Sequence, residues 1–112
     1  MKRGDVYLAY LNPKKGAEVG KIRPVLIIQT DFLNEIYHPT IIVLPLSTKL
    51  IDNAYPLRFR INKRDKLQKD SDILCDQIRA ISIDRLKEKL TTLTNSELKE
   101  IENQVKIILD FI

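Results

Sequence analysis

The stretch Thr-Ile-Ile-Val-Leu-Pro-Leu at residues 40–46 is an unbroken apolar run rich in β-branched side chains. β-branched residues favour extended backbone, so this run predicts a strand. A second apolar run covers residues 24–29 and also predicts a strand. Residues 5–11 alternate instead, with Val6, Leu8 and Tyr10 on one face. The first part of the chain is therefore predicted to be β-rich.

Shorter strands are predicted further along the chain. Residues 57–61 alternate between apolar and basic side chains, and residues 72–83 contain two short apolar stretches. Segments rich in turn residues lie between the runs, at 12–21, 30–39 and 49–56, and loops of this kind carry function when a rigid sheet holds them. About five to seven short strands separated by turns are typical of a small antiparallel barrel or sandwich.

The end of the chain changes to a helical period. Thr94-Asn95-Ser96-Glu97 has the form of a capping box, in which Thr94 accepts a hydrogen bond from the Glu97 amide and Glu97 reaches back. Apolar residues then recur at helical spacing at Leu98, Ile101, Val105, Ile108, Leu109 and Ile112. An amphipathic helix from Ser96 to about residue 110 is therefore predicted to pack on the β core. We interpret residues 1–112 as one domain, mainly β, with a terminal helix.

The composition is that of a folded chain with a modest basic excess. Hydrophobic residues make up 44% and charged residues 30%, which excludes an intrinsically disordered or fibrous protein. The net charge of +4 is unevenly distributed, because the first 83 residues hold 14 basic against 9 acidic residues and the remainder carries −1. This distribution fits a partner rich in phosphates or carboxylates, and a slightly basic solvated surface is the alternative.

The chain has one cysteine, Cys75, and one histidine, His38. These counts exclude an internal disulfide, a cysteine-based zinc site and a multi-histidine metal site within one chain, so we expect no metal and no cofactor. Cys75 is expected to fill core, and His38 to lie exposed in a loop. The sequence has no signal-peptide pattern and no apolar run of the ~20 residues that a membrane span needs, so we expect a cytoplasmic protein.

Arg23 is the first candidate site residue. It follows a basic segment with Glu18 and Lys21 and precedes Pro24, which disfavours helical backbone at Arg23. Arg23 is therefore expected in an extended conformation at the base of a strand, where its planar fork of donors can face a phosphate. Pairing with Glu18 or Asp5 is the structural alternative.

Ser47, Thr48 and Lys49 come directly after the apolar run at residues 40–46. Hydroxyls at the end of a strand can donate to a phosphoryl oxygen, and Lys49 adds positive charge. The alternative is turn formation, because Ser and Thr side chains often bond to neighbouring backbone groups.

A third polar group, Asp76, Gln77 and Arg79, interrupts an otherwise apolar segment. Strand alternation would send Asp76 and Ile78 to one face and Gln77 and Arg79 to the other. Buried polar groups need partners, so this segment indicates either a hydrogen-bonded network or a functional site.

Taken together, these segments resemble the MazF/PemK (Kid) family of toxin endoribonucleases from type II toxin-antitoxin systems. The resemblance covers nearly the whole chain. It is carried by Arg3-Gly4-Asp5-Val6, Gly16-Ala17-Glu18, Lys21-Ile22-Arg23-Pro24-Val25-Leu26, Pro45-Leu46-Ser47-Thr48 and Asp76-Gln77-Ile78-Arg79.

The resemblance implies an SH3-like small barrel, shared with CcdB-type toxins, and a homodimer. It implies sequence-specific cleavage of single-stranded RNA without a metal ion, in which the 2′-hydroxyl attacks the phosphate and leaves a 2′,3′-cyclic phosphate. It further implies an acidic antitoxin protein, similar to MazE, whose tail fills the RNA groove. The toxin–antitoxin complex of such systems binds promoter DNA, so DNA binding through the antitoxin is expected.

Carried over position by position, the resemblance implies that Arg23 is the catalytic arginine and Ser47 a catalytic hydroxyl, with Thr48 beside it. Asp76 matches an acidic residue implicated at some family sites. The residues expected to contact RNA are Glu18, Lys21, Lys49, Gln77 and Arg79. The general base stays unassigned, with Asp76 as one candidate.

The chain departs from some relatives at two positions. Ala17 stands where some members carry a histidine, and Leu74 where some carry an arginine, so the chain is expected to resemble an arginine-plus-hydroxyl branch. One alternative function is a CcdB-like gyrase-binding toxin. CcdB-type toxins depend on a C-terminal Trp-Gly-Ile, whereas this chain has no Trp. The other alternative is a noncatalytic nucleic-acid-binding module.

Overall fold

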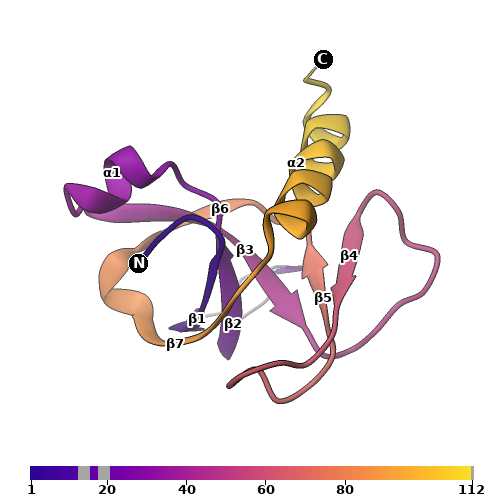
Figure 1. Ribbon diagram of the computed structural model, residues 1–112, viewed down its shortest axis with the longest axis horizontal. Coiled ribbons are helices and arrows are strands. Elements are labelled where there is room, and N and C mark those ends of the chain that lie inside the picture. Colours follow the sequence, from indigo (N-terminus) through magenta and orange to yellow (C-terminus); the bar gives the residue numbers. More distant parts are fainter. Residues whose placement is uncertain (13–15, 18–20, 112) are drawn as a thin grey trace.

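The computed structural model describes residues 1–12, 16–17 and 21–111 (Figure 1). This part of the chain forms seven short strands, two α-helices and a single 3₁₀ turn. The elements are β1 (Asp5–Tyr10), β2 (Ile22–Ile27), α1 (Asp31–Glu35), β3 (Thr40–Ser47), β4 (Arg58–Ile61), β5 (Ser71–Leu74), β6 (Arg79–Ser82), a 3₁₀ turn (Ile83–Arg85), β7 (Leu86–Thr92) and α2 (Asn95–Leu109).

Antiparallel pairing joins the strands in the order β4-β5-β3-β2-β1-β7, with β6 added to β3. β3 is long enough to change partners along its length: its first half pairs with β6, its middle with β2 and its last two residues with β5. The turn after β4 then reaches β7 at the far edge, where the Lys66 N–H donates to the Leu90 carbonyl at 3.0 Å. The sheet thus curls into a small barrel, which within the described chain stays open between β4 and β7. The predicted mainly β fold with a terminal helix is confirmed.

Apolar side chains on the two faces of the central strands form two separate cores. Val6, Leu26 and Leu44 belong to the core beneath α2, whereas Val25 and Val43 belong to the core on the other face. A strand that is buried on both faces has a continuous apolar sequence, whereas a strand with one solvated face alternates between apolar and polar residues. This burial explains why the runs at residues 24–29 and 40–46 are unbroken.

α2 covers the first core through Leu98, Ile101 and the buried Gln104. The N-terminal segment passes close beneath it: Gly4 has a φ of +97°, and a Cβ at this position would lie 2.7 Å from Leu98 Cδ1. Both the positive φ and the short distance to Leu98 therefore favour glycine, which has no Cβ, at this position. No helix in the described ranges is long and apolar enough to cross a membrane.

The structure differs from the sequence prediction in four places. α1 lies in the segment predicted to be a loop, as a five-residue helix capped by Thr30. β7 was not predicted, because as an edge strand it carries charged residues and buries only Leu90 and Thr91. The alternation predicted for residues 76–79 is wrong, since Asp76 and Gln77 lie in the turn between β5 and β6. Leu109, expected on the packed face of the helix, is 39% exposed.

Glu97 links the start of α2 to the segment after β4. The predicted capping box is present, with the Glu97 N–H 3.1 Å from Thr94 Oγ1 and the Thr94 N–H 2.9 Å from Glu97 Oε1. The guanidinium of Arg64 also donates to both Glu97 oxygens, at 2.7 and 2.9 Å. These bonds, chiefly that from Arg64, lower the pKa of Glu97 below its usual value. The carboxylate therefore stabilises the folded state above the pKa of the unfolded chain, and this contribution is lost as the pH falls through the lowered pKa.

We predict that Glu97→Gln lowers the free energy of unfolding by about 1 kcal/mol at pH 7, because the variant keeps the shape of the side chain but loses its charge. The difference from wild type should shrink as the pH is lowered from about 5 to about 3. Urea unfolding of the variant and of wild type at pH 7 and across this acidic range tests the prediction. Glu100→Gln, at an exposed position on the same helix, is the matched control. Equal stability of Glu97→Gln and wild type at pH 7 would contradict the prediction.

Candidate functional site

Arg23 lies on β2, close to the point where β3 ends. It pairs with Ala9 of β1, and continuing the observed β2–β3 register, in which Val25 faces Pro45, brings Arg23 opposite Ser47. The side chain is half-buried, and its Nη1 lies 3.5 Å from the Leu46 carbonyl. The sheet therefore places the guanidinium beside the last residues of β3, as the extended conformation imposed by Pro24 predicts.

A pocket of about 210 Å³ opens at this place. It is lined by Lys21, Ile22, Arg23, Pro24, Leu46, Thr48 and Ser71. Of the predicted site residues, Lys21, Arg23 and Thr48 are thus brought together from the segment before β2, from β2 itself and from the turn after β3. Two cationic side chains and an exposed hydroxyl on a shared pocket suit an anion such as a phosphodiester, because each can donate a hydrogen bond to a phosphoryl oxygen.

Ser47 and Lys49 take part in the turn that follows β3. Ser47 is nine-tenths buried, and its Oγ accepts a hydrogen bond from the Lys49 N–H at 3.2 Å. This is the turn-forming arrangement that the sequence left open as an alternative. Lys49 is exposed. Thr48, the next residue along the chain, is exposed, and its side chain is the hydroxyl that lines the pocket with Arg23.

The third predicted group lines a different pocket. Asp76, Gln77 and Arg79 lie with Ala17 and Ile78 around a pocket of about 370 Å³. Ala17 and Lys21 both belong to the segment between β1 and β2, so this segment contributes to both pockets. Glu18, predicted to contact RNA, lies outside the described residues.

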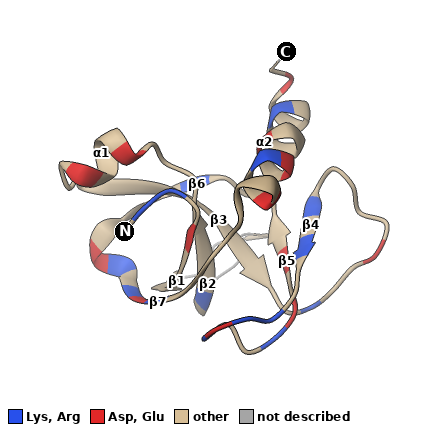
Figure 2. Ribbon diagram, viewed as in Figure 1, with Lys and Arg blue, Asp and Glu red and all other residues tan. Residues whose placement is uncertain are grey.

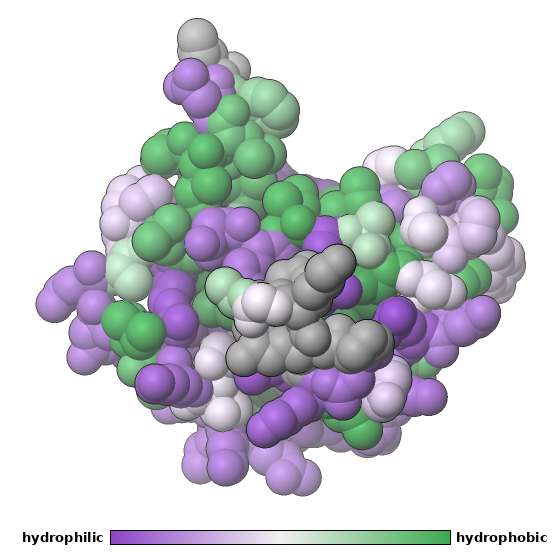
Figure 3. Space-filling view, turned by 180° about the vertical axis from the view of Figure 1, so that it is seen from behind, coloured by the Kyte–Doolittle hydropathy of each residue, from purple (hydrophilic) through white to green (hydrophobic). Residues whose placement is uncertain are grey.

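The pocket of Arg23 continues into a wider groove. Pro24, Thr48 and Ser71 also line a neighbouring pocket of about 310 Å³, which extends to Lys66 and Lys69 in the segment after β4. Figure 2 shows Lys and Arg at the start of β2, along β4 and in this segment. The opposite view in Figure 3 shows hydrophobic side chains gathered over α2, whereas hydrophilic ones cover most of the lower half of the molecule. Among the charged residues that line the pocket of Arg23 and this groove, Lys21, Arg23, Lys66 and Lys69 are basic and Glu88 is acidic, and this basic excess would attract a polyanion.

Sequence reasoning missed a carboxylate next to this groove, Asp72 on β5. Its side chain is only 1% exposed, and it accepts hydrogen bonds from the Ile51 N–H, Arg58 and Arg60. Burial by itself raises the pKa of a carboxyl group, but here the bonds from Arg60, Ile51 and Arg58 outweigh burial and lower the pKa of Asp72. An aspartate in an otherwise apolar run, with two arginines two residues apart on the preceding strand, was the signal in the sequence.

The two residues that the sequence predicts to be inert at the site are placed as expected. Cys75 is 1% exposed within the first core, and burial raises the pKa of its thiol to about 12. His38 is exposed in the segment after α1. In the described part of the chain, no group of three His, Cys, Asp or Glu side chains is arranged to hold a metal ion.

The model of the family of PemK-like, MazF-like toxins of type II toxin-antitoxin systems matches residues 2–109. The chain belongs to this toxin family. An endoribonuclease MazF from Staphylococcus saprophyticus subsp. saprophyticus is 48% identical over 110 residues, which cover 97% of this chain and 91% of the relative. The family that the sequence motifs predict is thereby confirmed.

Solved structures of MazF toxins share the fold. MazF of Deinococcus radiodurans superposes with a TM-score of 0.82 at 19% identity, covering 98% of this chain and 96% of that one. The Mycobacterium tuberculosis toxin MazF-mt6 gives 0.79 at 19% identity, covering 96% and 98%. A mycobacterial endoribonuclease in complex with its cognate antitoxin gives 0.75 at 20% identity, covering 100% and 95%. At such identities the likeness shows the MazF-type fold.

Proposed function

We propose that this protein is the toxin of a type II toxin-antitoxin system and that it cleaves single-stranded RNA at specific sequences without a metal ion. One observation carries the proposal: in a member of the PemK/MazF toxin family, Arg23, Lys21 and Thr48 line a single pocket at the end of β3. The 48% identical relative is named an endoribonuclease, which favours cleavage over noncatalytic binding of nucleic acid and over a gyrase-binding role. We expect it to act in the cytoplasm, where its substrate is found.

In the proposed reaction the RNA supplies its own nucleophile. The 2′-oxygen forms a bond to phosphorus, the bond to the 5′-oxygen breaks, and the products are a 2′,3′-cyclic phosphate and a 5′-hydroxyl. The protein must hold the phosphate in line and stabilise the charge that grows on its non-bridging oxygens. Arg23 would bind these oxygens through its guanidinium, and Thr48 would donate a further hydrogen bond.

One proton must leave the 2′-hydroxyl and another must reach the 5′-oxygen. Asp76 is the carboxylate candidate from the sequence, and it lines the neighbouring pocket and not the pocket of Arg23. The pocket with Asp76, Gln77 and Arg79 offers both acceptors and donors. We therefore assign this pocket to contacts with the bases or the backbone of the RNA, and proton transfer stays unassigned.

We further propose two protein partners. A second copy of the chain would form a homodimer, in which the grooves of two weakly basic barrels combine along one RNA strand. An acidic antitoxin would occupy the same grooves. A mycobacterial endoribonuclease whose structure was solved in complex with its cognate antitoxin shares the fold of this chain, which supports a partner of this kind. Binding of promoter DNA would occur through the antitoxin.

We predict that Arg23→Ala lowers the single-turnover cleavage rate on the order of 10²–10³-fold, the usual scale for losing one preorganised donor to a transition state. Arg23→Lys keeps the charge but loses the bidentate fork, so a large defect should remain. Cleavage of mixed-sequence RNA in the presence of EDTA measures both variants and tests metal independence in the same assay.

Thermal unfolding of each variant shows whether the protein is still folded. Lys87→Ala, which removes an exposed positive charge from β7, is the control for a general electrostatic effect, and its rate should stay close to that of wild type. Wild-type cleavage by folded Arg23→Ala would overturn the assignment of Arg23.

The homodimer predicts a sedimentation mass about twice the 13.0 kDa of one chain at micromolar concentration. Dilution until the chain is monomeric should abolish cleavage, because each RNA groove would then lose its other half. A monomer that cleaves at the dimer's rate would contradict the shared groove.

The antitoxin encoded beside this chain should stop cleavage when it is present at saturation, since both ligands would use the basic groove. Its affinity should fall as salt is raised, because much of the attraction is electrostatic. Cleavage assays across a titration of the antitoxin at low and high salt measure this. An unchanged rate at saturation would show that the antitoxin binds elsewhere.

A further inference from the structure

One buried carboxylate, that of Asp72, binds the turn after β3. We propose that Asp72 is a positioning residue for RNA cleavage, which fixes this turn so that Thr48 faces the pocket of Arg23. The inference rests on the proposed function, which it deepens by naming a residue that acts through Thr48. Asp72 itself touches neither this pocket nor the neighbouring groove.

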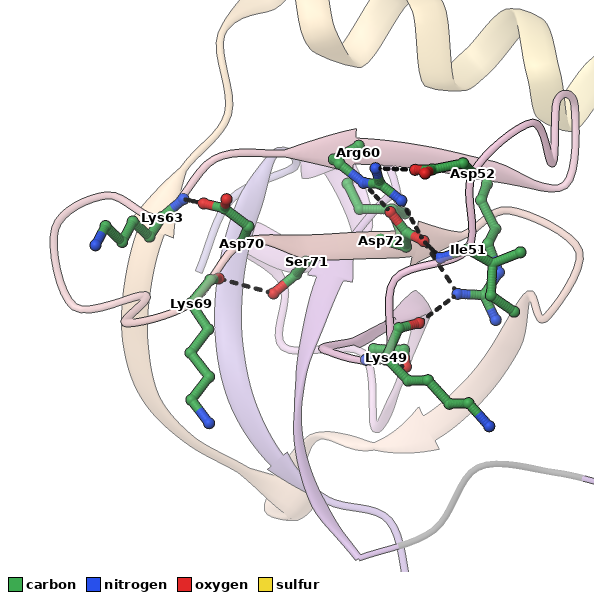
Figure 4. Close-up of polar contacts among 12 residues, drawn as sticks. Lys49, Ile51, Asp52, Arg60, Lys63, Lys69, Asp70, Ser71 and Asp72 are labelled. Atoms are coloured by element: carbon green, nitrogen blue, oxygen red, sulfur yellow. Dashed lines mark hydrogen bonds and ion pairs between the residues drawn. The ribbon is translucent and has the colours of Figure 1, made fainter.

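The side chain of Asp72 contacts one residue of the segment between β3 and β4 and two arginines of β4 (Figure 4). Asp72 Oδ2 accepts hydrogen bonds from the Ile51 N–H at 2.9 Å and from Arg58 Nη1 at 3.1 Å. Asp72 Oδ1 accepts one from Arg60 Nε at 2.9 Å. Each carboxylate oxygen is therefore engaged, as a buried carboxylate requires.

The two arginines extend this attachment to further residues of the turn. Arg58 Nη1 also donates to the Lys49 carbonyl at 3.0 Å, and Arg60 Nη1 forms an ion pair with Asp52. Together with Ile51, three of the four residues that follow Thr48 are bound to Asp72 directly or through an arginine. In Figure 4, dashed lines join Arg60 both to Asp52 and to Asp72.

Thr48 lies between two fixed points. On one side Ser47 ends β3, where it pairs with Asp72 in the β3–β5 ladder. On the other side the backbone of Lys49 is bound at two atoms: its N–H donates to Ser47 Oγ, and its carbonyl accepts a hydrogen bond from Arg58. Thr48 is exposed, so its orientation depends on these neighbours and not on packing of its own.

A carboxylate at this position is costly for a merely structural purpose. Taking the charge out of water is unfavourable, and an apolar side chain of similar volume would often stabilise a β core as well or better. Precise placement of a reacting group, by contrast, has a large effect on rate, because a displacement of about 1 Å can cost about 10²-fold. The contacts of Asp72 are therefore better explained by positioning than by stability.

Asp72→Asn tests the proposal, because it keeps the shape of the side chain but turns an acceptor into a donor facing other donors. The single-turnover rate at saturating RNA should fall on the order of 10-fold, while the KM changes less than about 2-fold. Hydrogen exchange of the Ile51 amide should quicken on the order of 10-fold, which reports on the turn independently of activity.

Asp31→Asn is the matched control. Asp31 lies at the start of α1 and lines neither the pocket of Arg23 nor the neighbouring groove. Its Oδ1 accepts a hydrogen bond from the Arg3 N–H at 2.7 Å, so it binds a backbone N–H as Asp72 does, but at a different place in the fold. This variant should cleave RNA at the wild-type rate and leave exchange at Ile51 unchanged.

A double-mutant cycle separates positioning from general destabilisation. If Asp72 acts through Thr48, Asp72→Asn should lower the rate by less than about 2-fold in a Thr48→Ala background. A structural role would instead give the same loss in both backgrounds. If Asp72→Asn does not fold, Arg60→Gln replaces it. The Arg60 side chain is 38% exposed, and its substitution removes one ion pair of the same network.

The outcomes distinguish the two proposals. A wild-type protein that leaves RNA intact overturns the proposed function and with it any role of Asp72 in cleavage. A wild-type protein that cuts RNA, together with an Asp72→Asn variant that cuts equally fast, overturns the inference about Asp72 alone. Equal losses in the wild-type and Thr48→Ala backgrounds overturn it too.

Discussion

The pairing of β3 with three other strands is the constraint on which the rest of the structure depends. Its first half is tied to β6, its middle to β2 and its last residues to β5, so the strand must bend as the sheet curls. Both faces of β3 are buried, which fixes its register, since a slip of one residue would move apolar side chains between the two cores. Where β3 ends, its neighbours β2 and β5 bring Arg23 and Ser71 to the same pocket as Thr48.

Charge is used in two different ways near this pocket. Around the groove the basic side chains are exposed or half-buried, where they can attract a polyanion and exchange water for phosphate. At Asp72 the charge is buried and saturated by donors, so it is unsuited to binding RNA and suited to holding backbone. An exposed site supported by a buried polar network combines access for the substrate with a fixed geometry.

Much of this could be predicted from the sequence because the signals are local. The strands at the centre of the sheet follow from β-branched and apolar runs, and the start of α2 follows from the capping box of Thr94 and Glu97. β7 could not be predicted from the sequence in the same way, because the sequence of an edge strand with one solvated face resembles that of a charged loop. α1 is a single short turn, which carries too few residues for a helical period.

The sequence by itself determined the family, the mainly β fold and the candidate residues, because motifs and hydrophobic patterns are properties of neighbouring positions. Only the tertiary structure decided that Thr48 and not Ser47 lines the pocket of Arg23, and that Asp76 belongs to a different pocket. It also decided that Asp72 faces Arg58, Arg60 and Ile51. These relations join strands far apart in the chain, and they depend on how the sheet curls, which no local pattern specifies.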